Sequence, residues 1–143
     1  MTRRHSALSS LFLVVVATLV ALPGVRAHES RPAYLQVDET APGRYEVLWR
    51  TPLLWGMRLP VALKLPADAR NVTEPVLREF SDSLVERRIV EVNGGLAGKR
   101  IEFVGLQATI TDVLVRVQLH DGKHSTALVH PSLPWIEPRR RAD

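Results

Sequence analysis

The feature that most constrains the fold is an alternation of apolar and polar side chains that begins at Tyr34 and recurs along the chain. Its clearest stretch is residues 112–119, where valines occupy every second position from 113 to 117. A two-residue period is typical of half-buried β-strands, whereas an amphipathic helix repeats about every 3.6 residues. The pattern therefore predicts an all-β protein.

Short alternating runs separated by turn residues predict seven or eight strands. They cover residues 34–38, 44–50, 60–66, 76–84, 85–92, 99–104, 112–119 and 125–129. Residues 76–84 also fit a short helical turn, and we favour a strand. The regular spacing predicts an immunoglobulin-like antiparallel β-sandwich over residues 28–131.

The side chains expected in the core come from these strands and from one connecting segment. They are Leu35, Val37, Val47, Trp49, Leu63, Leu65, Ile89, Phe103, Leu106, Val113, Val115 and Val117. From residue 132 to residue 143 the chain is rich in proline and arginine. We expect a tail without regular structure there.

The first 27 residues have the organisation of a secretory signal peptide. Arginines precede an apolar run over residues 8–22, and Val25 and Ala27 supply the small residues that signal peptidase accepts. The run has about 15 residues, whereas a helix that spans a bilayer needs about 20. We expect cleavage between Ala27 and His28 and export to the periplasm, with an uncleaved N-terminal anchor as the alternative.

Composition excludes several classes of function. The net charge of +4 falls to +1 on cleavage, because residues 1–27 contain three arginines and no acidic residue. A balanced charge with 6% aromatic residues offers no basic face with stacking rings, so we expect no nucleic-acid binding. The chain has no cysteine, which excludes disulfides, thiol nucleophiles and thiolate metal sites. Membrane contact is expected to be peripheral at most.

Five segments occur in a characteristic order: HESRPAYL at 28–35, YEVLWRTP at 45–52, GLAG at 95–98, GLQATITDVLVRV at 105–117, and the Asp121-Gly122 turn. Together they resemble the exported N-terminal domain of HupE/UreJ-like membrane proteins. The resemblance implies a periplasmic accessory domain whose partner is a HupE/UreJ-type membrane protein or another envelope protein. The wider family is associated with nickel or cobalt uptake, but the histidines of its membrane region have no counterpart here.

Histidines provide the candidate metal ligands. Cleavage after Ala27 would leave His28 with an α-amine and an imidazole that together chelate copper or nickel. His120 and His124 flank the Asp121-Gly122-Lys123 turn and add nitrogen donors near one carboxylate. The alternatives are a terminus without metal and an ordinary surface turn. A periplasmic copper or nickel binding protein that uses His28 is thus the second function to consider.

No arrangement of nucleophile, base and orienting acid is recognisable in the sequence, and we expect a non-enzymatic domain without catalytic residues. Leu53, Leu54 and Trp55 stand in a segment without strand alternation. Such a segment fits either a loop that exposes a partner-binding patch or a loop that caps the open end of the sandwich. The main hypothesis is therefore an accessory or interaction domain.

Overall fold

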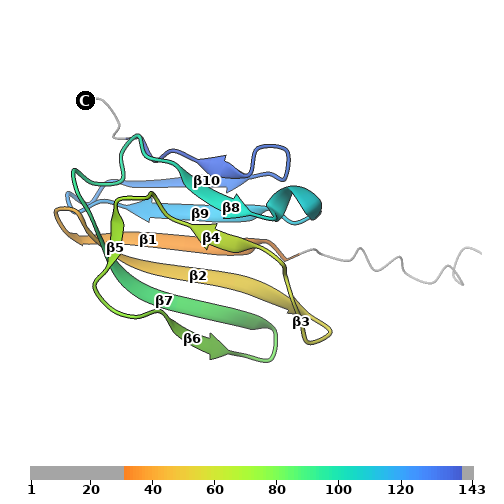
Figure 1. The fold of residues 1–143 in the computed structure, drawn as a ribbon. Helices are drawn as coiled ribbons and strands as arrows, with labels where there is room; N and C mark the ends of the chain where they lie inside the picture. Colours follow the sequence, from red (N-terminus) through yellow and green to blue (C-terminus); the bar gives the residue numbers. More distant parts are fainter. Residues whose placement is uncertain (1–30, 140–143) are drawn as a thin grey trace, which may run out of the picture.

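The computed structural model describes residues 31–139, in which every regular element is a strand except one three-residue 3-10 helix (Figure 1). The expected all-β class is confirmed. No helix in this range has the length and apolar character needed to cross a membrane. The elements are β1 (Ala33–Ala41), β2 (Arg44–Leu54), β3 (Met57–Arg58), β4 (Ala62–Lys64), β5 (Ala69–Asn71), β6 (Val76–Glu79), β7 (Ser83–Val92), β8 (Ile101–Val104), η1 (Leu106–Ala108), β9 (Val113–Gln118), β10 (His124–Val129) and β11 (Trp135–Ile136).

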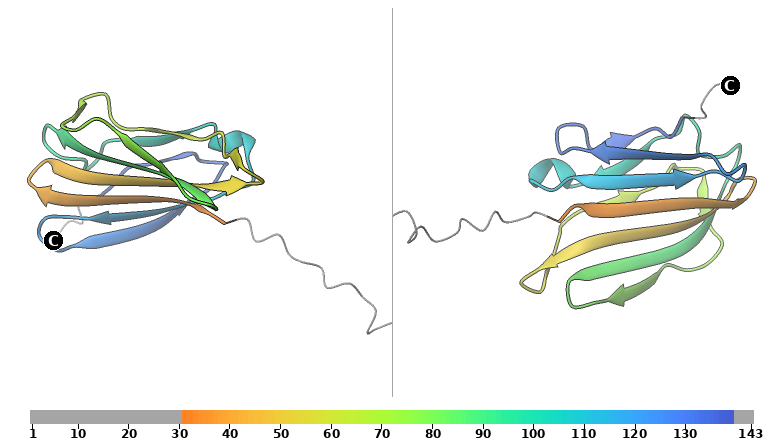
Figure 2. Two further views of the ribbon diagram at one scale, coloured as in Figure 1. Left: turned by 90° about the horizontal axis from the view of Figure 1, so that it is seen from below. Right: turned by 180° about the vertical axis from the view of Figure 1, so that it is seen from behind.

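The strands form a large and a small sheet that lie face to face (Figure 2). The large sheet has the order β10-β9-β1-β2-β7-β5, with β3 added to β2 and β6 to β7, and the small sheet has the order β11-β8-β4. β1 pairs antiparallel with β2 but parallel with β9. The prediction of a purely antiparallel arrangement is therefore wrong at this one pairing, because β9 returns beside β1 instead of joining it through a hairpin.

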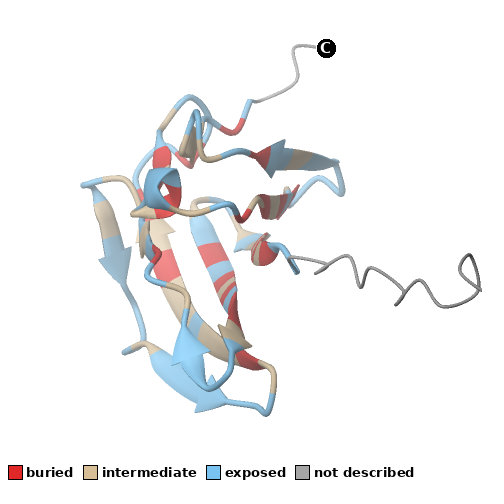
Figure 3. Cartoon of the chain, turned by 90° about the vertical axis from the view of Figure 1, so that its right-hand side faces the viewer, coloured by how far each residue is buried: buried red, intermediate tan, exposed pale blue. Residues whose placement is uncertain are grey.

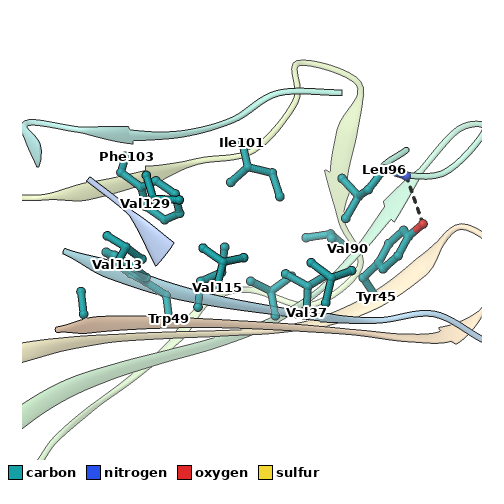
Figure 4. Close-up of a cluster of buried hydrophobic side chains, with 14 of the residues drawn as sticks. Val37, Tyr45, Trp49, Val90, Leu96, Ile101, Phe103, Val113, Val115 and Val129 are labelled. Carbon is teal, nitrogen blue, oxygen red and sulfur yellow. Dashed lines mark hydrogen bonds between the residues drawn. The ribbon is translucent and has the colours of Figure 1, made fainter. Parts of the chain in front are cut away.

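The core fills the space between the two sheets (Figure 4). The rings of Trp49 from β2 and Phe103 from β8 lie 5.4 Å apart and link the sheets. Tyr45 is also buried, and its hydroxyl accepts a hydrogen bond from the Leu96 backbone N–H at 3.1 Å. Of the predicted core residues, Leu63 and Leu65 are only partly buried, and the following are buried: Leu35, Val37, Val47, Trp49, Phe103, Leu106, Val113, Val115 and Val117.

The prediction for Ile89 is wrong. Ile89 pairs with Glu46 on the outer face of the large sheet, and its neighbour Val90 is in the core. Inward-facing positions of β7 therefore include Glu86 and Arg88, which form an ion pair at 2.9 Å while largely shielded from solvent. Mutual charge compensation allows two charged side chains to face inward, which reverses the pattern that hydrophobicity alone suggests.

The predicted tail also contains regular structure. Trp135 and Ile136 form β11 and pair with Glu102 and Ile101 of β8. The carbonyl of Pro134 accepts a hydrogen bond from Phe103 N at 2.9 Å. Proline can take part in this way because it keeps its carbonyl acceptor, although it lacks an N–H donor. This segment therefore completes the small sheet instead of extending into solvent.

Residues 31–139 form eleven strands instead of the seven or eight predicted, and several predicted boundaries differ from the structure. Residues 76–84 contain a strand, as favoured, but a turn at 80–82 separates β6 from the start of β7. The strand expected over 60–66 is limited to Ala62–Lys64. Prolines at residues 60 and 66 flank it, where they lack the N–H that a longer ladder would use.

Candidate functional site

Strand register gathers four connections at one end of the molecule. The starts of β1 and β9 lie side by side, and the end of β10 adjoins the start of β9. The end of β2 lies beside both the start of β1 and the start of β7. The β2–β3 turn, the β6–β7 turn, the segment before β9 and the segment after β10 therefore share this end, which is on the right in Figure 1 and faces the viewer in Figure 3.

Large apolar side chains are exposed in each of these four connections or beside it. We call this set the apolar end: Leu54, Trp55, Met57, Phe80, Ile110 and Leu133. The turns at the opposite end, over residues 42–43, 93–100 and 119–123, contain no exposed large apolar residue among those the structure describes. The two ends therefore have different surface chemistry.

Trp55 has the most unusual conformation in this set. Leu54 pairs with Met57, so Trp55 and Gly56 alone form the turn of a two-residue hairpin. Both have positive φ, 57° for Trp55 and 75° for Gly56, as a type I′ turn requires. Asn, Asp or Gly usually occupies such positions, whereas a bulky residue there is strained. Trp55 is also 90% exposed, so core packing does not compensate the strain.

The structure corrects the sequence interpretation of this segment as a loop. Leu53 and Leu54 belong to β2, and Trp55 is at the tip of the β2–β3 hairpin. Leu53 is only half-buried, while Leu54 and Trp55 are exposed. The turn chemistry was hidden from the sequence because Trp-Gly is not a typical I′ pair.

Ion pairs surround the apolar end. Asp82, in the β6–β7 turn, accepts hydrogen bonds from Arg31 Nη1 at 2.8 Å and from Arg50 Nη2 at 3.4 Å. The Ser83 hydroxyl and these two guanidiniums hold the pKa of Asp82 below its ordinary value. Arg58 and Glu79 form a further pair at 3.8 Å. Exposed apolar side chains with a charged rim have the composition of a protein-binding surface.

The predicted histidine ligands are at the opposite end. His120 and His124 are exposed at the β9–β10 turn, and the register of His124 with Gln118 places it on the outer face of the sheet. Asp121 accepts a hydrogen bond from Lys123 N, which lowers the pKa of Asp121. Across residues 31–139, no group of three or more histidine, aspartate or glutamate side chains is arranged to hold a metal ion. His28 lies outside the described residues.

Sequence reasoning missed one histidine contact and one carboxylate hub. His130 Nδ1 lies 2.9 Å from Asp112 Oδ1, a pairing that sequence separation conceals. Glu39 Oε1 accepts hydrogen bonds from Gly43 N at 3.0 Å and Tyr45 Oη at 3.2 Å, and Glu39 Oε2 accepts one from His120 N at 3.0 Å. Partial burial raises the pKa of Glu39, but these hydrogen bonds outweigh burial and lower it overall.

A cleft of about 1410 Å³ opens between the inner face of β9 and β10 and the segment after β10. Its apolar walls include Val115, Val117, Leu133, Trp135 and Ile136. Its polar margin lies at the β9–β10 turn. The cleft therefore resembles an open groove along the side of the sandwich more than a catalytic pocket.

A scan of protein-family models gives no match to the chain. A search of curated proteins likewise gives no matching relative.

Proposed function

We propose that the chain is an exported, non-enzymatic interaction domain that docks through its apolar end onto a membrane protein of the HupE/UreJ type in the periplasm. The proposal rests on one observation: Trp55 has a strained, positive φ and is exposed at the tip of a hairpin. This side chain strains its backbone and packs against little of its own chain. Its burial by a partner would supply binding energy that offsets the cost of the strain. Tryptophan is also enriched among residues that dominate binding energy.

The surroundings of Trp55 support a protein partner. Leu54 and Met57 extend the apolar surface, and Arg58 with Glu79 provides a polar rim. The immunoglobulin-like assignment is part of the same proposal. It is supported by buried Trp49 packed against Phe103 between the sheets.

The test uses the exported protein and a HupE/UreJ-type membrane protein from the same genome, reconstituted in nanodiscs. Binding is measured by biolayer interferometry for the wild-type protein, for Trp55→Ser and for Leu54→Ser/Trp55→Ser. Val72→Ser is the matched control, because Val72 is an exposed apolar residue in the connection between β5 and β6. Nanodiscs that contain lipid alone separate protein binding from lipid binding.

We expect Trp55→Ser to weaken binding by about 30-fold or more, as for a central interface residue. Val72→Ser should leave binding unchanged. Equal binding of wild-type and Leu54→Ser/Trp55→Ser would overturn the apolar end as the docking surface. Binding to lipid-only nanodiscs that matches binding to the loaded nanodiscs would overturn the protein partner.

A further inference from the structure

β10 has a free edge with a defined hydrogen-bonding pattern. Within residues 31–139 it is the terminal strand of the large sheet and pairs with β9 alone. In the adjoining turn, Leu119 N donates to Lys123 O at 2.7 Å, which marks this pair as a hydrogen-bonded one. Because such pairs alternate along an antiparallel ladder, residues 125, 127 and 129 bond to β9. The backbone groups of His124, Thr126 and Leu128 therefore point away from the sheet.

The β10 edge lacks the usual protection against further strand pairing. Natural edge strands carry charged residues, prolines or bulges. His124–Val129 contains no Lys, Arg, Asp, Glu or Pro, and its register with β9 has no irregularity. By contrast, β6 at the other side of the large sheet is shorter and carries Arg78 and Glu79. Of these two edge strands, β10 is therefore the longer one and the one without charged residues.

The cleft beside this edge specifies the side chains that an added strand would bring. Ser125 and Ala127 face the same side as the buried valines of β9, and both line the cleft. Both side chains are small, and Trp135 lines the same cleft. A strand added to β10 would direct every second side chain toward this apolar space. The inward side chains of a second copy of β10 would be Ser125, Ala127 and Val129, of which only the valine is a large apolar residue.

We propose that the β10 edge binds an extended segment of a partner protein with bulky apolar residues at alternate positions. The outward backbone groups of His124, Thr126 and Leu128 pair with the segment, and the cleft accepts its apolar side chains. This mode is strand addition to an exposed sheet edge. The surface runs along the side of the sandwich and shares only Leu133 with the apolar end. The inference rests on the β10 backbone and therefore does not depend on the proposed function.

The experiment uses the whole exported protein and a short fluorescein-labelled peptide in which Val, Phe and Leu alternate with Thr between terminal lysines. Binding is followed by fluorescence polarisation, and hydrogen exchange by NMR reports the amides of β10. Thr126→Pro removes an outward N–H without removing a β9 hydrogen bond. Thr126→Val is the matched control, because it keeps the N–H and the β-branched shape. The same peptide N-methylated at alternate positions tests these hydrogen bonds on the wild-type protein, independently of how Thr126→Pro folds.

We expect the peptide to bind wild-type and Thr126→Val alike, with at least a 10-fold loss in Thr126→Pro and for the N-methylated peptide. The amides of residues 124, 126 and 128 should become protected from exchange. Absence of peptide binding, or equal binding of the N-methylated peptide, would overturn strand addition. Concentration-dependent dimerisation that protects the same amides and excludes the peptide would assign the edge to a second copy and overturn the foreign segment.

Discussion

Trp55 combines conformational strain with almost complete exposure, and this combination separates stability from binding at a single position. Asparagine adopts positive φ more readily than tryptophan and is favoured in type I′ turns. Trp55→Asn should therefore raise the free energy of unfolding by about 1 kcal/mol. Chemical denaturation measures the change.

The same variant should lose binding to the proposed membrane partner. If Trp55→Asn is more stable but no longer binds, Trp55 contributes to binding and lowers the free energy of unfolding. A variant that is less stable than wild type would show that Trp55 makes contacts that stabilise the hairpin, contrary to this prediction.

Glu39 should make stability depend on pH. Its folded-state pKa is below the ordinary value of 4.5, because hydrogen bonds from Gly43, His120 and Tyr45 outweigh burial. Its contribution is therefore fully present above about pH 4.5 and is lost as pH falls through the folded-state pKa. Glu39→Gln places an amide N–H₂ against N–H donors and should cost about 1–3 kcal/mol at pH 7.

Urea unfolding between pH 3 and pH 7 tests this expectation. The difference between wild type and Glu39→Gln should shrink as the pH falls. Glu46→Gln, an exposed glutamate of β2, is the control and should have little effect at either pH. A difference that stays constant across the range would contradict the role assigned to the Glu39 carboxylate.

The histidine candidates should act separately toward metal. His28 precedes Ala33 by five residues, a reach of about 17 Å even when fully extended. His120 contacts Glu39, which lies about 20 Å from Ala33 along β1. A shared site would require the leading segment to fold back along the whole strand.

Calorimetric titration with copper(II) of protein that begins at His28 measures this separation. His120→Ala and His124→Ala should leave the copper affinity unchanged, whereas one alanine added before His28 should remove any site built on the terminal amine. A joint loss in the His120 and His124 variants would show that the two ends of β1 do contribute to one site.

At the scale of elements, alternation predicted the long strands well because their inner faces are apolar, as in the valines of β9. It failed in β7, where an ion pair between Glu86 and Arg88 occupies inward positions. It also failed for β11, whose two residues form a strand only because β8 offers hydrogen bonds. Local periodicity carries no information about which distant segments pair. The parallel β1–β9 ladder and the open cleft therefore could not be predicted from the sequence.

The same limit applies to the candidate site. Leu54 and Trp55 were identified from hydrophobicity alone, but Phe80, Ile110 and Leu133 join them only through strand register. The positive φ at Trp55 could not be predicted either, because it follows from a two-residue hairpin connection that the sequence pattern does not indicate.

The connection between β8 and η1 should be sensitive to a single methyl group. Gly105 has φ 94°, and a Cβ there would lie 2.3 Å from the carbonyl oxygen of Pro60. Gly105→Ala should therefore cost about 3 kcal/mol or more, because both the backbone and the segment before β4 must move. Gly94→Ala is the matched control, with φ 73° and open space at the Cβ position, and should cost about 1 kcal/mol. Thermal unfolding compares them, and equal losses would show that the clash with Pro60 is relieved without cost.

At the scale of the whole molecule, three surfaces of different chemistry face in different directions. The apolar end gathers four connections, the opposite end carries polar turns, and the β10 edge runs along one side. Arg31, the first described residue, adjoins the start of β1 at the apolar end. The first described residue and the proposed docking surface therefore lie at one end, and the polar turns lie at the other.

This orientation can be followed with the three tryptophans of the chain. Trp49 is buried and Trp135 is half-buried under Arg100, so only Trp55 is fully available to solvent. In a Trp49→Phe/Trp135→Phe variant, emission comes from Trp55 alone. On addition of the partner in nanodiscs, we expect this emission to shift to shorter wavelength and acrylamide quenching to fall several-fold, because burial removes water from the indole. A Trp55 signal that stays fully quenchable while interferometry records binding would place the interface elsewhere on the sandwich, and the β10 edge would then be the next surface to test.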